Sequence, residues 1–319
     1  MELKDVLPVL AGGIVILVIA LVVKPMLLGE PIGLGSRETV PLPELPEYRP
    51  PTPVATATPL PDDGEVYTRS FRWTSIDGGV HTTEISVPKA LFHEHRETPR
   101  YADHLYWGRY ALEDADRPVL EDLARQIAPP VDNPDKEYFR LMNLIFFVQQ
   151  IPYDADGNTT SYIEGTLPPH TLSVKGSIEY PKYPVETLVD GRGDCEDAAI
   201  LMAGLLDVLG YDTVLLEYSD HMALGIRMDA FNPYYAKYLP RYFTHEGKRY
   251  YYVEGTDFEW NYVSRYSTAR WGKPLAIGDT QDASIASVRS ENPRIIPICY
   301  IPTPEEYQIY PVRLPKGGA

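Results

Sequence analysis

The sequence predicts an α+β fold that follows a single transmembrane helix. Residues 66–88 alternate between polar and apolar side chains around a glycine-containing turn, which is typical of a β-hairpin. Apolar stretches with helix-start residues come next along the chain, and three short strand-like runs follow the last of them. A chain of 319 residues has enough apolar mass for a stable core without metal or disulfide staples.

Residues 1–28 form the predicted membrane anchor. Residues 6–23 carry no charge, and a helix of about 18 residues crosses most of a ~30 Å hydrocarbon layer. A cleaved signal peptide is the alternative, but it needs a basic start and small residues before the cleavage point. This chain begins MELKD and has Lys24 and Pro25 in that region, so we expect an uncleaved anchor.

Residues 29–63 form a predicted linker that is rich in proline and threonine and favours extended polyproline geometry. Basic residues are more frequent after the anchor than before it, which by charge counting would keep the domain inside. A stalk of this composition is typical of domains held outside a cell. We therefore expect a single-pass membrane protein whose folded domain is extracytoplasmic.

The folded part is divided into three predicted regions. Residues 64–115 form a β-rich region that begins with the hairpin, with its turn at Asp77. Residues 116–270 form the core, in which Asp116 and Asn133, each just ahead of a proline, start two helices that run to Ala128 and Gln150. Residues 271–319 are proline-rich, and we expect them to wrap the core as coil.

A third helix is predicted to begin near Cys195, with Asp194 as its cap and Gly210 at its end. Strands are predicted at residues 213–218, 221–227 and 249–255. In the second strand, period-two geometry places His221 with the small residues of one face, and the bulky apolar residues on the other. We expect the helix that begins near Cys195 to pack against the face with the small residues, which we call the bare face. The residues concerned are Ala223 and Gly225 on the first face and Met222, Leu224 and Ile226 on the second.

These elements carry a candidate thiol site. Cys195, in the first turn of a helix, lies at the positive end of the helix dipole, which favours the thiolate, whereas Glu196 and Asp197 oppose it. His221 is the candidate base, and an acid must hold its other nitrogen. The nearby acids alternate in direction along an extended strand, so only one of them can face His221. These acids are Glu254, which shares a face with Tyr250 and Tyr252 and is preferred, and the alternative Asp257.

The same residues resemble the transglutaminase-like superfamily, in particular its membrane-anchored archaeal and bacterial members. The resemblance covers residues 71–260 and is carried by the segments YPVETLVDGRGDCEDAAILMAGLLDVLGYD (183–212), HMALGI (221–226), YYYVEGT (250–256) and FVQQIPYD (147–154). It implies a papain-like fold in which a helix bearing cysteine packs on an antiparallel sheet bearing histidine and an acid.

When the catalytic residues of the family are carried over to this sequence by position, the resemblance implies Cys195 as nucleophile and His221 as general base. Glu254 occupies the position of the acid, where many members have aspartate followed by proline and threonine. Gln149 matches a glutamine that the family keeps near the site, which implies a role beside the Cys195 amide in holding an oxyanion, and Asp194 supports the site. No cofactor is implied.

Metal and nucleic acid are not expected as partners. His93 and His95 could form a metal-binding pair, but no third ligand lies near them in the sequence. Residues 154–165 do not match a calcium loop, because the glycine comes too early and no acid stands at the last position. The formal net charge is −16, from 29 basic and 45 acidic residues, which argues against nucleic acid.

The expected function is that of a membrane-anchored cysteine peptidase or protein-glutamine acyltransferase, acting on the amide bonds of a protein or peptide substrate through a thioester. A surface peptide-binding module without turnover is the first alternative. A structural protein with a disulfide between Cys195 and Cys299 is the second, because two cysteines permit either one disulfide or two thiols.

Overall fold

The computed structural model describes residues 66–75, 78–132, 136–228, 238–256, 275–283 and 285–298, and all of them belong to one compact unit, Leu45–Ala319. The predicted anchor and linker lie outside these residues. In the described part of the chain, no helix has both the length and the apolar character needed to span a membrane. The fold is α+β, with helices and antiparallel sheets, as the sequence predicts.

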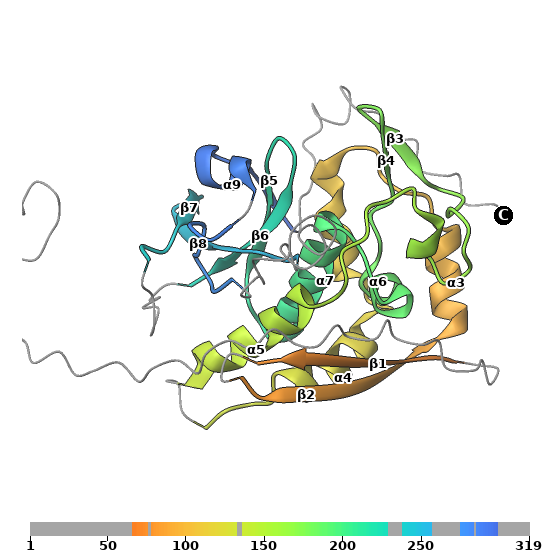
Figure 1. Ribbon diagram of the computed structural model, residues 1–319, viewed down its shortest axis with the longest axis horizontal. Coiled ribbons are helices and arrows are strands. Elements are labelled where there is room, and N and C mark those ends of the chain that lie inside the picture. Colours follow the sequence, from red (N-terminus) through yellow and green to blue (C-terminus); the bar gives the residue numbers. More distant parts are fainter. Residues whose placement is uncertain are drawn as a thin grey trace, which may run out of the picture. The chain divides into compact units, whose positions relative to one another are not determined.

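The predicted hairpin is confirmed. Strands β1 (Val66–Thr74) and β2 (Val80–Pro88) pair antiparallel, and they lie along one side of the unit beneath the helices (Figure 1). The inward residues Phe71, Trp73 and Ile85 are buried in the main core, whereas alternate residues face outward. Helix α3 (Lys89–Glu97) and the 3₁₀ helix η2 (His104–Leu112) follow.

Five further strands form the central sheet, in the order β7-β8-β6-β5-β9, with every neighbouring pair antiparallel. The three predicted strands appear as β5 (Thr213–Glu217), β6 (Met222–Arg227) and β8 (Lys248–Val253), and β7 (Tyr242–His245) forms one edge.

The other edge of the sheet corrects an expectation. Residues 271–319 were expected to be coil, but they supply α9 (Ala286–Ser290) and β9 (Arg294–Pro297), which pairs with β5. The Arg-Ile-Ile-Pro run of β9 is too short to stand out in the sequence, and its strand character comes from the neighbour that it pairs with.

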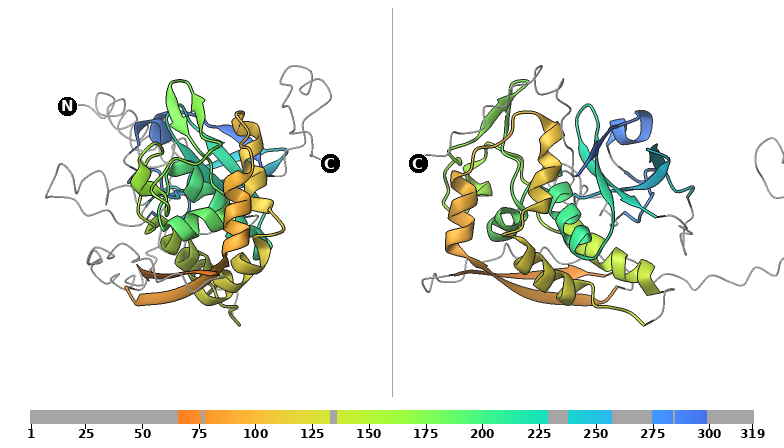
Figure 2. Two further views of the ribbon diagram at one scale, coloured as in Figure 1. Left: turned by 90° about the vertical axis from the view of Figure 1, so that its right-hand side faces the viewer. Right: turned by 180° about the vertical axis from the view of Figure 1, so that it is seen from behind.

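The predicted helices lie between this sheet and the hairpin, as Figures 1 and 2 show from three sides. They are α4 (Arg117–Ile127), α5 (Glu137–Gln149) and α7 (Cys195–Val208), with the additional short helix α6 (Pro184–Asp190). Helix α7 contacts α4, α5, α6, η2 and the sheet, so it is the central element of the core. The small elements η4 (Thr159–Ser161), β3 (Leu172–Val174) and β4 (Ser177–Glu179) lie in the connection between α5 and α6.

The packing of β6 contradicts the expectation that α7 would cover its bare face. Met222, Leu224 and Ile226 belong to the same core as α7, whereas Ala223 belongs to a second core on the opposite face of the sheet. Bulky apolar side chains gain more from burial in the larger core. The small residues instead make room for neighbouring strands: a Cβ at Gly225 would lie 2.8 Å from Val214 Cγ2.

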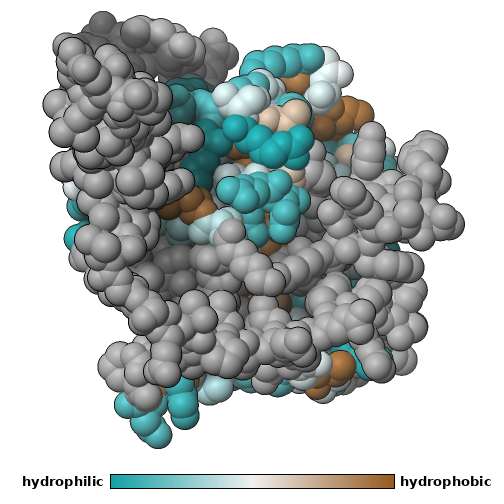
Figure 3. Space-filling model, turned by 60° about the vertical axis from the view of Figure 1, so that its left-hand side comes forward, coloured by the Kyte–Doolittle hydropathy of each residue, from teal (hydrophilic) through white to brown (hydrophobic). Residues whose placement is uncertain are grey.

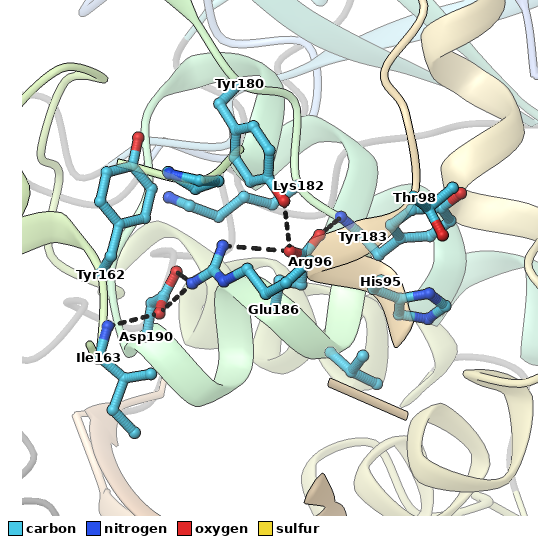
Figure 4. A network of polar contacts seen from close by, with 12 residues as sticks. His95, Arg96, Thr98, Tyr162, Ile163, Tyr180, Lys182, Tyr183, Glu186 and Asp190 are labelled. Atoms are coloured by element: carbon cyan, nitrogen blue, oxygen red, sulfur yellow. Dashed lines mark hydrogen bonds and ion pairs between the residues drawn. The ribbon is translucent and has the colours of Figure 1, made fainter. Parts of the chain in front are cut away.

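A buried polar network joins α3 to α6 (Figure 4). Arg96 donates to both oxygens of Asp190, each at 2.6 Å, and to Glu186 Oε1 at 3.1 Å. Arg100 donates to Glu186 Oε2 at 2.5 Å and to the hydroxyl of Tyr180. Glu186 is completely buried, and the guanidinium groups of Arg96 and Arg100 balance its negative charge. This network fixes the helix that immediately precedes the turn to Cys195.

On the face shown in Figure 3, the described residues that can be seen are mainly hydrophilic, with small apolar areas between them. Two exposed apolar side chains, Leu239 and Tyr242, lie at β7 or just before it.

Candidate active site

Cys195 is the first residue of α7, and the turn before it is held on both sides. Helix α6 ends at Gly191, whose φ of 68° is in the region that favours glycine. Gly193 then exchanges backbone hydrogen bonds with the segment around Tyr153: its N–H donates to Pro152 O at 3.2 Å, and its O accepts from Asp154 N at 2.9 Å. The position of the thiol is therefore set by backbone contacts.

The first turn of α7 is anchored by a buried ion pair. Lys182 Nζ donates to Asp197 Oδ2 at 2.7 Å, and both side chains are fully buried. The same carboxylate accepts from the Asp194 N–H at 3.3 Å, so Asp194 is the N-cap residue that the sequence predicts. The Asp194 Oδ2 also accepts from the N–H of Asp156 at 3.3 Å.

The Cys195 thiol is surrounded by both donors and acids. The backbone N–H of Met222 lies close enough to the thiol to lower its pKa, and the thiol donates to Glu196 Oε2 at 3.2 Å. Burial raises the pKa of the Cys195 thiol, and the charges of Glu196 and Asp194 raise it further, whereas the Met222 amide acts in the opposite direction. Burial and the neighbouring acids therefore outweigh the helix dipole and favour the protonated thiol.

His221 and Glu254 form a buried pair at the ends of β6 and β8. Leu224 pairs with Val253 across these antiparallel strands. The same register, continued past the strand ends, places His221 opposite Thr256 and close to Glu254. His221 Nε2 lies 3.2 Å from each oxygen of the Glu254 carboxylate. The structure thus brings the predicted base and the preferred acid together.

Glu254 is held as a carboxylate by its surroundings. Burial pushes its pKa upward, but the charge and hydrogen bond of His221, the Tyr252 hydroxyl and the Thr256 backbone N–H outweigh burial and lower the pKa to about 2. The hydroxyl of Thr256 donates at 2.8 Å and the N–H of Gly255 at 3.0 Å. With this many donors, the carboxylate has one orientation.

The acid loop packs directly on the cysteine helix. A Cβ at Gly255 would lie 3.1 Å from Ala198 Cβ and 3.3 Å from the Ala199 nitrogen, so a side chain there would crowd the first turn of α7. The close approach explains a glycine at this position. Together with the Met222 contact, it places the histidine and acid strands against the start of α7.

Gln149 supports the acid strand. Its Nε2 donates to the backbone carbonyls of Glu254 and Leu275, each at 2.9 Å, and the side chain is buried. Both amide hydrogens are therefore committed to the backbone, and the expected oxyanion contact would require a different rotamer. The alternative acid, Asp257, lies outside the described residues, as does Cys299, whereas Cys195 is a free thiol.

Two site residues were missed by sequence reasoning. Tyr252 donates to Glu254, and its position on the same face as Glu254 was the available signal. Tyr153 is partly buried, and the pKa of its hydroxyl is raised by burial and then by the charges of Cys195 and Asp194, so the hydroxyl lies within electrostatic range of the thiol. Its position four residues after Gln149 gave no indication of this contact.

The histidine pair lies outside the site. His93 and His95 are on helix α3 and not on a strand, so residues two apart point in different directions. His95 Nε2 contacts Asp116 Oδ1 at 2.6 Å and its ring stacks on Tyr183, which is a structural role.

Comparison with known proteins gives no relative: no family model, no curated protein and no solved structure matches this chain.

Proposed function

We propose that this chain is a transglutaminase-like cysteine enzyme that acts on peptide or glutamine amide bonds. The observation that carries the proposal is the arrangement of Cys195, His221 and Glu254: the amide of Met222, which follows His221, lies close enough to the Cys195 thiol to lower its pKa, and Glu254 holds the imidazole. A helix bearing cysteine that packs on an antiparallel sheet bearing histidine and an acid also supports a papain-like fold.

The proposed reaction gives each nitrogen of His221 a role. Nε2 faces Glu254, so Nδ1 is the nitrogen that takes the thiol proton. Because burial and the neighbouring acids favour the protonated thiol, this transfer occurs as the sulfur attacks the carbonyl carbon, and His221 acts as general base in that step. Glu254 orients the ring and stabilises the imidazolium that forms.

The remaining steps follow from acyl transfer chemistry. The oxyanion formed by attack needs nearby donors, and the Cys195 backbone amide and the Tyr153 hydroxyl are the candidates. The imidazolium of His221 returns its proton to the departing amine or ammonia as the carbon–nitrogen bond breaks, leaving a thioester on Cys195. Water then gives hydrolysis, and a lysine-like amine gives cross-linking. The predicted anchor would hold this activity at a membrane, facing outward.

Turnover is tested with a glutamine-rich protein substrate such as casein, by following peptide cleavage, ammonia release and incorporation of a fluorescent amine. We expect activity in at least one of the three, and a loss of roughly a hundredfold or more in His221→Ala and complete loss in Cys195→Ala. Cys299→Ser is the matched control, because it removes the other thiol and should keep the activity.

A peptide-binding module without turnover is the second candidate, and the raised pKa of the Cys195 thiol favours it. It predicts that all three readouts stay at background in the wild-type protein. It also predicts that Cys195→Ala still binds the same substrate.

A further inference from the structure

A short β-hairpin lies at the same end of the unit as the connection between β5 and β6 (Figures 1 and 2). Its strands, β3 and β4, pair antiparallel through three residue pairs. The two turn residues, Lys175 and Gly176, have φ angles of 49° and 89°, and a two-residue turn with positive φ at both positions matches the twist of a hairpin. We call this hairpin, residues 172–179, the arm.

The base of the arm lies close to the thiol. One oxygen of Glu179 lies within 4.8 Å of an oxygen of Glu196, whose carboxylate accepts the hydrogen bond of the Cys195 thiol. The next residue, Tyr180, donates its backbone N–H to Asp156, so the chain is held where it leaves β4. The arm therefore starts at the carboxylates that surround Cys195.

The tip of the arm lies near the strand that leads to His221. The hydrogen bond of His104 lowers the pKa of Glu217 most, and the charge of Lys175 acts in the same direction, so Lys175 is within electrostatic range of Glu217. Glu217 is the last residue of β5, and the chain passes from there to His221. The arm thus extends from the acids beside Cys195 towards the strand end beside His221.

One face of the arm is turned towards the start of α7. Residues that pair across antiparallel strands point to the same side, so Leu172 shares a face with Glu179, and Val174 shares a face with Ser177. Residues two apart on one strand also share a face, so these four side chains form one surface. Because Glu179 reaches the carboxylates at the start of α7, Leu172 and Val174 lie on the side of the arm that faces the thiol.

Leu172 and Val174 are apolar side chains that the fold leaves partly exposed. Among the residues that the structure describes, neither of them packs into the main core or into the second core. An apolar side chain that the fold does not bury can still be buried by a ligand, and this burial favours binding.

We propose that Leu172 and Val174 form an apolar wall beside the thiol, and that this wall contacts an apolar side chain of the substrate close to the reacting amide. The inference rests on the proposed function, since it takes Cys195 as the reacting group. A three-residue strand is about 10 Å long, which matches about three residues of an extended peptide. The substrate class is therefore a peptide with an apolar residue within about three positions of the reacting amide.

Binding to the Cys195→Ala protein tests the wall without turnover. The probes are two fluorescent peptides that differ only in the residues around a central glutamine, which are leucines in one peptide and serines in the other. Fluorescence anisotropy measures their binding. We expect the leucine peptide to bind roughly tenfold more tightly, as apolar contacts in a hydrophobic site allow. Leu172→Ser or Val174→Ser, introduced into the same protein, should remove most of this preference.

Ile178→Ser is the matched control. Ile178 lies on the opposite face of the same arm and is 43% exposed, so the change removes the same kind of side chain from the other side. It should leave the preference for the leucine peptide unchanged. Thermal unfolding of every variant shows that the fold is retained, and we expect the preference to fall in the two wall variants at an unchanged melting temperature.

The inference and the proposed function can fail separately. A binding preference for the leucine peptide, without turnover of either peptide by the wild type, would keep the wall and overturn the proposed reaction. Turnover of both peptides with equal kcat/KM would keep the reaction and overturn the wall. Equal binding of the two peptides, binding of neither, or the same loss of preference in Ile178→Ser would also overturn the wall.

Discussion

Glu254→Gln is expected to lower the free energy of unfolding by about 3 kcal/mol at neutral pH. Glu254 is buried, and its pKa falls from 4.5 to about 2 in the folded protein, a difference that corresponds to about 3 kcal/mol. Glutamine preserves the size of the side chain but removes the charge that His221, Tyr252 and Thr256 stabilise. Urea unfolding of both proteins, followed by circular dichroism, measures the difference.

The pH dependence of this difference identifies its origin. A carboxyl whose folded pKa is lowered contributes its full stability above the unfolded pKa of 4.5, and loses it as the pH falls towards 2. The wild type and Glu254→Gln should therefore converge in stability between these values. An offset that stays constant down to pH 2 would mean that packing, and not the charge of Glu254, holds the acid loop.

Glu186→Gln is expected to have the largest effect on stability, about 3–5 kcal/mol, because it leaves Arg96 and Arg100 buried with too little negative charge. The loss should appear as a lower urea midpoint with an unchanged slope.

The comparison variant for this prediction is Arg117→Gln, which removes two ion pairs, with Glu121 and Asp207, in which all the side chains are at least a third exposed. It should leave the midpoint unchanged, because solvent screens surface pairs. If Glu186→Gln is as stable as the wild type, then the network in Figure 4 does not fix α6 as described.

Local patterns predicted much of this fold. The hairpin, α4, α7 and three strands of the central sheet follow from periodicity, caps and turn residues. The preferred acid was also predicted locally, since Glu254 shares its direction with Tyr252. Each of these features depends on residues that are close to one another in the sequence.

The remaining features depend on contacts between distant segments. The strand β9 exists through pairing with β5, and the face of β6 that meets α7 is decided by which core is larger. Gln149 was expected at the thiol, but backbone carbonyls of Glu254 and Leu275 take its donors. The carboxylates of Asp156, Glu179, Asp194 and Glu196 come together from positions up to 40 residues apart in the sequence, so no local motif predicts their proximity.

We propose that His221 activates Cys195. The most direct measurement is the rate at which iodoacetamide alkylates each cysteine at neutral pH, located by mass spectrometry, in the wild type, His221→Ala and the matched control His93→Ala. Cys299 serves as an internal reference thiol in every sample. Cys195 is expected to react at least tenfold more slowly in His221→Ala, with Cys299 and the His93→Ala protein unaffected. Equal Cys195 rates in all three proteins would mean that His221 does not activate the thiol.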